Sequence, residues 1–74
     1  MTRPQFAPRH PAPSPDDIRA ARDAAGLTLK ASAELVRVDL RSWQRWEAGD
    51  REMPGAAWAL YRLRTRQITV DDLD

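Results

Sequence analysis

The chain has 74 residues, no cysteine and a formal net charge of +1, with twelve Lys and Arg residues against eleven Asp and Glu residues. This length fits one small domain, and the absence of cysteine excludes disulfides and thiolate metal sites. No apolar run approaches the roughly 20 residues that cross a bilayer. Because no signal peptide is recognised either, we expect a cytoplasmic protein without a membrane-spanning segment.

Residues 1–14 form a proline-rich arm that precedes the predicted domain, residues 15–74. Proline fixes φ and lacks an N–H, so we predict that the arm is disordered. Its charged residues are Arg3 and Arg9. Two interpretations of the arm stand, one as a DNA-contacting segment that enters a minor groove and one as an inert tail. His10 has no fixed partner there, so it predicts neither a metal site nor a catalytic base.

The first predicted helix begins at Ser14-Pro15 and ends at Gly26. Serine is a good cap, proline suits the first helical position, and the carboxylates of Asp16 and Asp17 favour the positive end of the helix dipole. Helical spacing places one set of residues on the inner face of this helix: Ile18, Ala21, Arg22 and Ala25. Capping explains the paired carboxylates here and at 71–72, so we expect no enzymatic site.

Residues 28–49 contain the pattern of two short helices joined by a sharp turn. Thr28 and Asp39 are suitable caps for helices over 29–36 and 40–48, and Gly49 is suitable for the end of the second. The segment Val36-Arg37-Val38 leaves room for little more than a turn. This arrangement predicts a helix-turn-helix, which places its second helix in the DNA major groove.

The helix over 40–48 has two chemically different faces. Trp43 and Trp46 are three positions apart, so both are predicted to point into the core. The opposite face contains Leu40 at its edge, Arg41, Ser42, Gln44, Arg45 and Ala48. A polar outer face is usual for an amphipathic helix. Here, however, its guanidinium and amide groups are those that pair with guanine and adenine, and Leu40 could cover a thymine methyl.

The remaining chain is predicted to complete the bundle. Residues 50–53 form a loop, and Pro54 opens a helix that continues to about residue 65. Trp58, Leu63 and either Leu60 or Tyr61 would cover the first three helices. Residues 69–72 have the spacing of a capping box, which predicts a last short helix. A short strand over 67–70 at a dimer seam is the open alternative.

A set of residues spread over these helices matches a known pattern: Gly26-Leu27-Thr28, Ala33, Val38, Trp46-Glu47, Gly49 and Pro54. With these residues the chain resembles the phage-repressor type of helix-turn-helix, the lambda-repressor/Cro-like or XRE family, from about Ile18 to Leu63. The resemblance implies an all-α fold, a compact bundle of four to five helices containing the helix-turn-helix, which binds operator DNA as a dimer.

The resemblance also implies roles for individual residues. Base contacts are expected from Leu40, Arg41, Gln44 and Arg45. Phosphate contacts are expected from Thr28, Lys30, Arg37, Ser42 and Arg51, around helix N-termini and loops. Arg22 and Glu47 match a pair that family members join as a partly buried salt bridge, which would set the angle of the helix over 40–48.

Three positions depart from the family pattern. Leu29 stands where a glutamine often touches the DNA backbone. Arg37 replaces the usual turn glycine, so either it adopts a positive φ or the turn differs. Ser32 and Trp43 replace two medium aliphatic residues, and they would conserve core volume if they were paired.

We therefore expect a sequence-specific double-stranded DNA-binding transcriptional regulator, a small autoregulatory repressor of phage, plasmid or mobile-element type. It would bind an inverted-repeat operator as a homodimer with half-sites roughly 34 Å apart. Its seam would be the helix after Pro54 and the tail from Gln67. No cofactor, metal or catalytic residue is expected. The alternative is a protein-binding adaptor, an antitoxin or antiactivator, that grips its partner through exposed Leu35 or Leu40.

Overall fold

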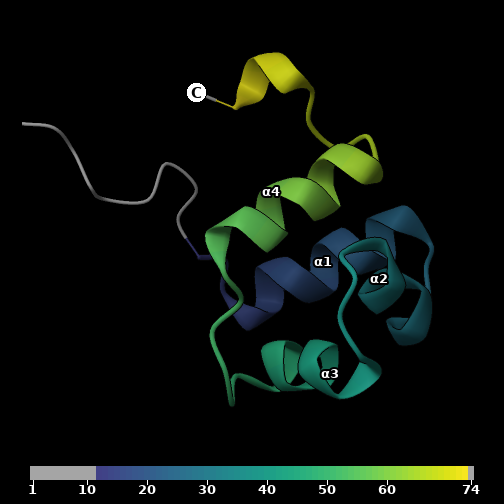
Figure 1. The fold of residues 1–74 in the computed structure, drawn as a ribbon, viewed down its shortest axis with the longest axis vertical. Helices are drawn as coiled ribbons and strands as arrows, with labels where there is room; N and C mark the ends of the chain where they lie inside the picture. The colour runs from purple at the N-terminus through teal and green to yellow at the C-terminus, as the bar shows by residue number, and fades with distance from the viewer. Residues whose placement is uncertain (1–11, 74) are drawn as a thin grey trace, which may run out of the picture.

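The computed structural model describes residues 12–73, and this part of the chain is all-helical without a strand. Its elements in chain order are α1 (Pro15–Ala25), α2 (Leu29–Leu35), α3 (Leu40–Ala48), α4 (Gly55–Arg64) and a 3-10 turn (Val70–Asp72). Helix α1 crosses the middle of the molecule, with α4 on one side and α3 on the other (Figure 1). The predicted all-α bundle is thus confirmed, whereas the prediction for residues 1–11 lies outside the described residues.

Local capping sets where the first three helices begin. The side chains of the three predicted caps each accept a hydrogen bond from the backbone N–H three residues on, at 3.1 Å for Ser14, 3.0 Å for Thr28 and 2.8 Å for Asp39. Gly26 and Gly49 follow α1 and α3 in the left-handed conformation, with φ of 69° and 84°. Because a side chain strains that conformation, glycine suits both helix ends.

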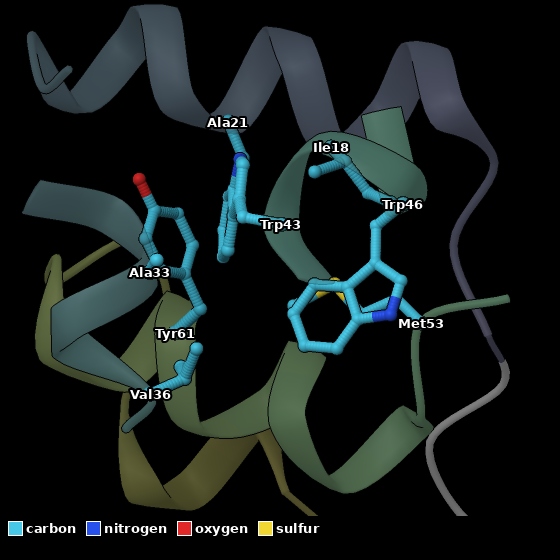
Figure 2. Close-up of a cluster of buried hydrophobic side chains, with 8 residues drawn as sticks. All are labelled: Ile18, Ala21, Ala33, Val36, Trp43, Trp46, Met53 and Tyr61. Atoms are coloured by element: carbon cyan, nitrogen blue, oxygen red, sulfur yellow. The ribbon is translucent and has the colours of Figure 1, made fainter. Parts of the chain in front are cut away.

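Two indole rings from α3 occupy the centre of the core. Trp43 is fully buried and Trp46 is 4% exposed, as the sequence predicts. Trp43 packs at tilted angles against Trp46 and Tyr61, with ring centroids 5.6 Å and 4.8 Å apart. Tilted aromatic pairs add to the stabilisation from burial. The rest of the cluster comes from α1, from α2 and the residue after it, and from the loop before α4: Ile18, Ala21, Ala33, Val36 and Met53 (Figure 2).

The open choice between Leu60 and Tyr61 is settled by burial, because Tyr61 is fully buried and Leu60 is half-buried. The Tyr61 hydroxyl lies 2.7 Å from the Ser32 hydroxyl, and neither residue is exposed to solvent. Ser32 therefore meets Tyr61, and the Tyr61 ring in turn meets Trp43. This hydrogen bond satisfies two polar groups that would be costly to bury alone.

The tail after α4 returns to the body of the domain. The Gln67 side-chain amide donates a hydrogen bond to the Ala21 carbonyl oxygen at 2.9 Å. The Thr69 N–H donates to the Asp72 carboxylate at 2.7 Å, where the 3-10 turn forms. The short-helix prediction is thus correct in kind, and the strand over 67–70 is wrong. Among residues 12–73, no helix has the length and apolar character needed to cross a membrane.

We predict that Tyr61→Phe lowers the free energy of unfolding by about 1–3 kcal/mol, because it leaves the buried Ser32 hydroxyl without a partner. Ser32→Ala should have a comparable effect through the Tyr61 hydroxyl. The double variant should lose clearly less than the sum of the two single losses. Urea denaturation of all four proteins measures this coupling, and strictly additive losses would show that the two hydroxyls are not bonded.

Candidate nucleic-acid interface

One face of α3 gathers the residues predicted to contact bases. Leu40, Arg41 and Gln44 are exposed and Arg45 is half-buried, whereas the indoles of the same helix are buried. Helix α3 lies at an edge of the molecule, and no other helix of residues 12–73 lies beyond it in this view (Figure 1). The four side chains are therefore accessible from one direction on a helix whose inner side is held by the core.

The beginning of α3 carries a fixed negative group. Asp39 Oδ1 accepts the hydrogen bond from the Ser42 N–H. Hydrogen bonding by the Ser42 side chain and backbone, with help from the charges of Arg41 and Arg45, lowers the pKa of the Asp39 carboxyl. At neutral pH this carboxylate is thus ionised and accepts hydrogen bonds only. It also occupies the Ser42 N–H, so a phosphate contact by Ser42 would have to use its hydroxyl.

The turn between α2 and α3 is built with Arg37 in the left-handed region, at φ 62°. Of the two possibilities that the sequence leaves open, the positive φ is the one observed. The N–H groups of Arg37 and Val38 donate to the carbonyls of Glu34 and Ala33 at 3.1 Å and 3.0 Å. These bonds close the end of α2, and the Arg37 side chain remains exposed.

The other predicted phosphate contacts lie on the surface as well. Lys30 and Arg51 are exposed, in the first turn of α2 and in the loop after α3. Thr28 is exposed at the N-cap of α2. Its hydroxyl accepts the Ala31 N–H, which leaves the hydroxyl proton for donation to another group. Each of these residues can therefore meet an anion outside the domain.

The buried carboxylate of Glu47 connects α3 to α1. Arg22 and Glu47 form the partly buried salt bridge that the family resemblance implied. Arg22 donates to both carboxylate oxygens, at 2.6 Å and 3.1 Å, so the pair is bidentate. The Trp43 indole N–H donates to Glu47 Oε2 at 2.6 Å, and Arg19 donates to the Glu47 carbonyl oxygen at 2.6 Å. Neither of these two contacts was predicted. The four-residue spacing of Trp43 and Glu47 is a signal for the first, because it places both on one helix face.

The ion pair is charged at neutral pH. Burial of Glu47 acts to raise its pKa, but hydrogen bonds from Arg22 and Trp43 outweigh burial, so the net pKa lies below the ordinary value. The hydrogen bond to Glu47 likewise raises the pKa of Arg22. Glu47, a residue that is only 7% exposed, therefore keeps its charge because Arg22 and Trp43 donate hydrogen bonds to its carboxylate.

Two further features of the described residues concern metal binding and the location of a pocket. Within residues 12–73, no group of three or more His, Cys, Asp or Glu side chains is placed to bind a metal ion. A pocket of about 400 Å³ lies between residues 12–15 and residues 49–53, with Trp46 and Met53 in its wall. It adjoins the end of α3 rather than the beginning, where Leu40 and Arg41 lie.

We predict that Glu47→Gln lowers the free energy of unfolding by about 3 kcal/mol at neutral pH, because Arg22 keeps a partly buried charge without its partner. Because the pKa of Glu47 is lower in the folded protein, its ionisation stabilises the fold fully at a pH above the pKa of glutamate in the unfolded chain, about 4.3. This stabilisation is lost as the pH falls through the lower folded-state pKa. Urea denaturation between pH 7 and pH 3 should therefore show that the difference in unfolding free energy between parent and variant becomes smaller as the pH falls.

Glu52→Gln is the matched control, because Glu52 is an exposed carboxylate in the loop before α4. Its effect on stability should be small at every pH. A gap between parent and Glu47→Gln that stays constant down to pH 3 would contradict the proposed role of the Glu47 charge.

No protein-family model matches the chain. Over 60 residues the chain is 28% identical to the type II methyltransferase M.MspI of a Moraxella species. The matched segment covers 80% of this chain and 14% of the methyltransferase, so the chain spans about a seventh of that protein's length.

Proposed function

We propose that the protein is a sequence-specific double-stranded DNA-binding transcriptional regulator of the phage-repressor helix-turn-helix type. The observation that carries this proposal is the outer face of α3, where Arg41, Gln44 and Arg45 share one accessible side of a helix anchored by two buried indoles. We infer that α3 enters the major groove and that the protein is a small autoregulatory repressor of phage, plasmid or mobile-element type.

The side chains of this face match the chemistry of base edges. Arg41 or Arg45 can donate two hydrogen bonds to guanine O6 and N7, and Gln44 can pair with adenine N6 and N7. Each such bidentate pair discriminates between bases by roughly 1–3 kcal/mol. The anchored inner side of α3 supports this function, because side chains on a fixed helix lose less freedom when they bind.

Affinity in this proposal comes from the exposed groups around α3. Thr28, Lys30, Arg37 and Arg51 would contact phosphates on the two strands that border the groove. The formal net charge of the chain is only +1, so these contacts depend on the positions of the basic side chains around α3 and not on the total charge. Neutralised phosphates release counterions, and binding should therefore weaken steeply with salt.

The size of α3 supports binding as a homodimer. Its nine residues span only about 14 Å, so one copy reads few base pairs. A two-fold dimer would read two half-sites roughly 34 Å apart on one side of the duplex. The proposed seam is α4 with the tail from Gln67, which includes Val70, a 73% exposed side chain.

The competing functions have less support. The segment shared with the type II methyltransferase is 14% of that protein, and we do not propose its enzymatic activity for this chain. The adaptor alternative relied on exposed Leu35 or Leu40. Leu35 is half-buried and packs against the core, so it is unsuited to grip a partner. Leu40 is 38% exposed but lies within the face that we assign to DNA.

Selection of bound sequences from a random duplex pool tests the function directly. We expect one enriched motif and a log–log loss of affinity with salt whose slope is near the number of phosphates contacted. Failure to bind any duplex at low salt would reject DNA binding and favour the adaptor.

Two arginine variants should separate base reading from phosphate contact. We predict that Arg45→Ala loses about fivefold or more of the preference for the selected motif over a scrambled duplex. Arg51→Ala should instead weaken binding to both duplexes equally and lower the salt slope by about 1. Fluorescence anisotropy measures both effects. An Arg45→Ala protein with the parent's preference would remove Arg45 from base reading.

We predict that the selected motif is an inverted repeat occupied by two chains. Sedimentation of the protein–DNA complex should give a 2:1 stoichiometry, and hydroxyl-radical footprints should protect two regions one helical turn apart. One chain bound to an asymmetric motif would refute the dimer without affecting the assignment of α3 to the groove.

A further inference from the structure

An exposed apolar side chain stands at the first position of α3. Leu40 is 38% exposed, and the other large exposed hydrophobic residue among residues 12–73 is Val70 in the tail. Residues at the beginning of a groove-reading helix face base edges. In the major groove the apolar group that pyrimidines offer is a methyl group on C5. Leu40 is therefore placed to recognise a C5-methyl group.

The residue before Leu40 restricts which methylated base fits. Asp39 Oδ1 accepts the Ser42 N–H, and each oxygen of an ionised carboxylate has more than one lone pair, so Asp39 can accept a further hydrogen bond from outside the domain. A carboxylate in the groove accepts from the N4 amino group of cytosine. Thymine presents an O4 acceptor at the same place, so a carboxylate beside thymine would meet a second acceptor. The combination of a methyl group and an amino donor exists on 5-methylcytosine.

The residue after Leu40 can bind a base next to the methylated one. Arg41 is exposed at the second position of α3. A guanidinium pairs best with O6 and N7 of guanine. Asp39, Leu40 and Arg41 thus present, in chain order, an acceptor, an apolar group and a two-donor fork at one end of α3.

We propose that this end of α3 recognises 5-methylcytosine adjacent to guanine in duplex DNA, so that the protein binds methylated sites in preference to unmethylated ones. The inference rests on the proposed function, because it requires α3 to lie in the major groove. It goes further by naming the chemical state of the DNA: Leu40 covers the methyl group, Asp39 accepts from N4, and Arg41 pairs with the guanine.

The test begins with two random duplex pools, one of them synthesised with 5-methylcytosine in place of cytosine. The best methylated duplex is then remade with cytosine, thymine or uracil at each methylated position, paired with the matching purine. Removal of the recognised methyl group, by the change to cytosine, should weaken binding about fourfold. Thymine should bind at least about fivefold more weakly than 5-methylcytosine, because it lacks the N4 donor.

Three variants assign the effects to residues. Leu40→Ala should bind the cytosine and 5-methylcytosine duplexes equally. Asp39→Asn keeps a good helix cap and adds a donor, so it should reduce the preference for 5-methylcytosine over thymine. Glu52→Gln is the control, because Glu52 is exposed in the loop before α4, outside the proposed DNA-reading face and the proposed dimer interface, and it should keep the parent's preference. Circular dichroism before each titration checks that the variants are folded.

The outcomes separate this inference from the proposed function. Enrichment of neither pool would reject DNA binding as a whole. Specific binding that is unchanged or weakened by methylation at every cytosine would overturn the methyl-reading role and leave the function standing. Equal binding of thymine and 5-methylcytosine at the sensitive position would also overturn it, because Asp39 would then select nothing.

Discussion

The Glu47 carboxylate is the interaction on which the geometry of this domain depends. It receives hydrogen bonds from Arg22 on α1 and from Trp43 on its own helix, and Arg19 binds the Glu47 carbonyl oxygen. A buried ion pair adds little net stability compared with apolar packing. Its directional bonds instead select one rotation of α3 about its axis. The same contact that ties α3 to α1 therefore determines which side of α3 is left for a partner.

That constraint divides α3 into a fixed inner side and an accessible outer side within nine residues. Trp43 and Trp46 fill the core, so a rotation of the helix would expose indole surface to water at a large cost. Arg41 and Gln44 are kept outside by the same packing. The candidate site is thus a product of the core, and changes deep in the domain should alter recognition without touching the site.

Much of the fold could be predicted from local signals in the sequence. The starts of three helices can be predicted from their caps, Ser14, Thr28 and Asp39, because a capping hydrogen bond joins residues only three positions apart. The three-residue spacing of the tryptophans identifies the inner face of α3. Contacts between distant segments were harder to predict. The pairing of Ser32 with Tyr61 and the bond from Gln67 to Ala21 depend on how helices pack, and no local pattern encodes that packing.

The left-handed conformation of Arg37 affects the folding stability of this protein. A non-glycine residue in that region sacrifices on the order of 1 kcal/mol of folding free energy relative to glycine. Stability alone would favour glycine in the turn, whereas the proposed DNA binding would favour an exposed guanidinium beside α3. The residue at position 37 therefore balances folding stability against the proposed contact with DNA. Selection for thermal stability would favour glycine there and would remove that contact.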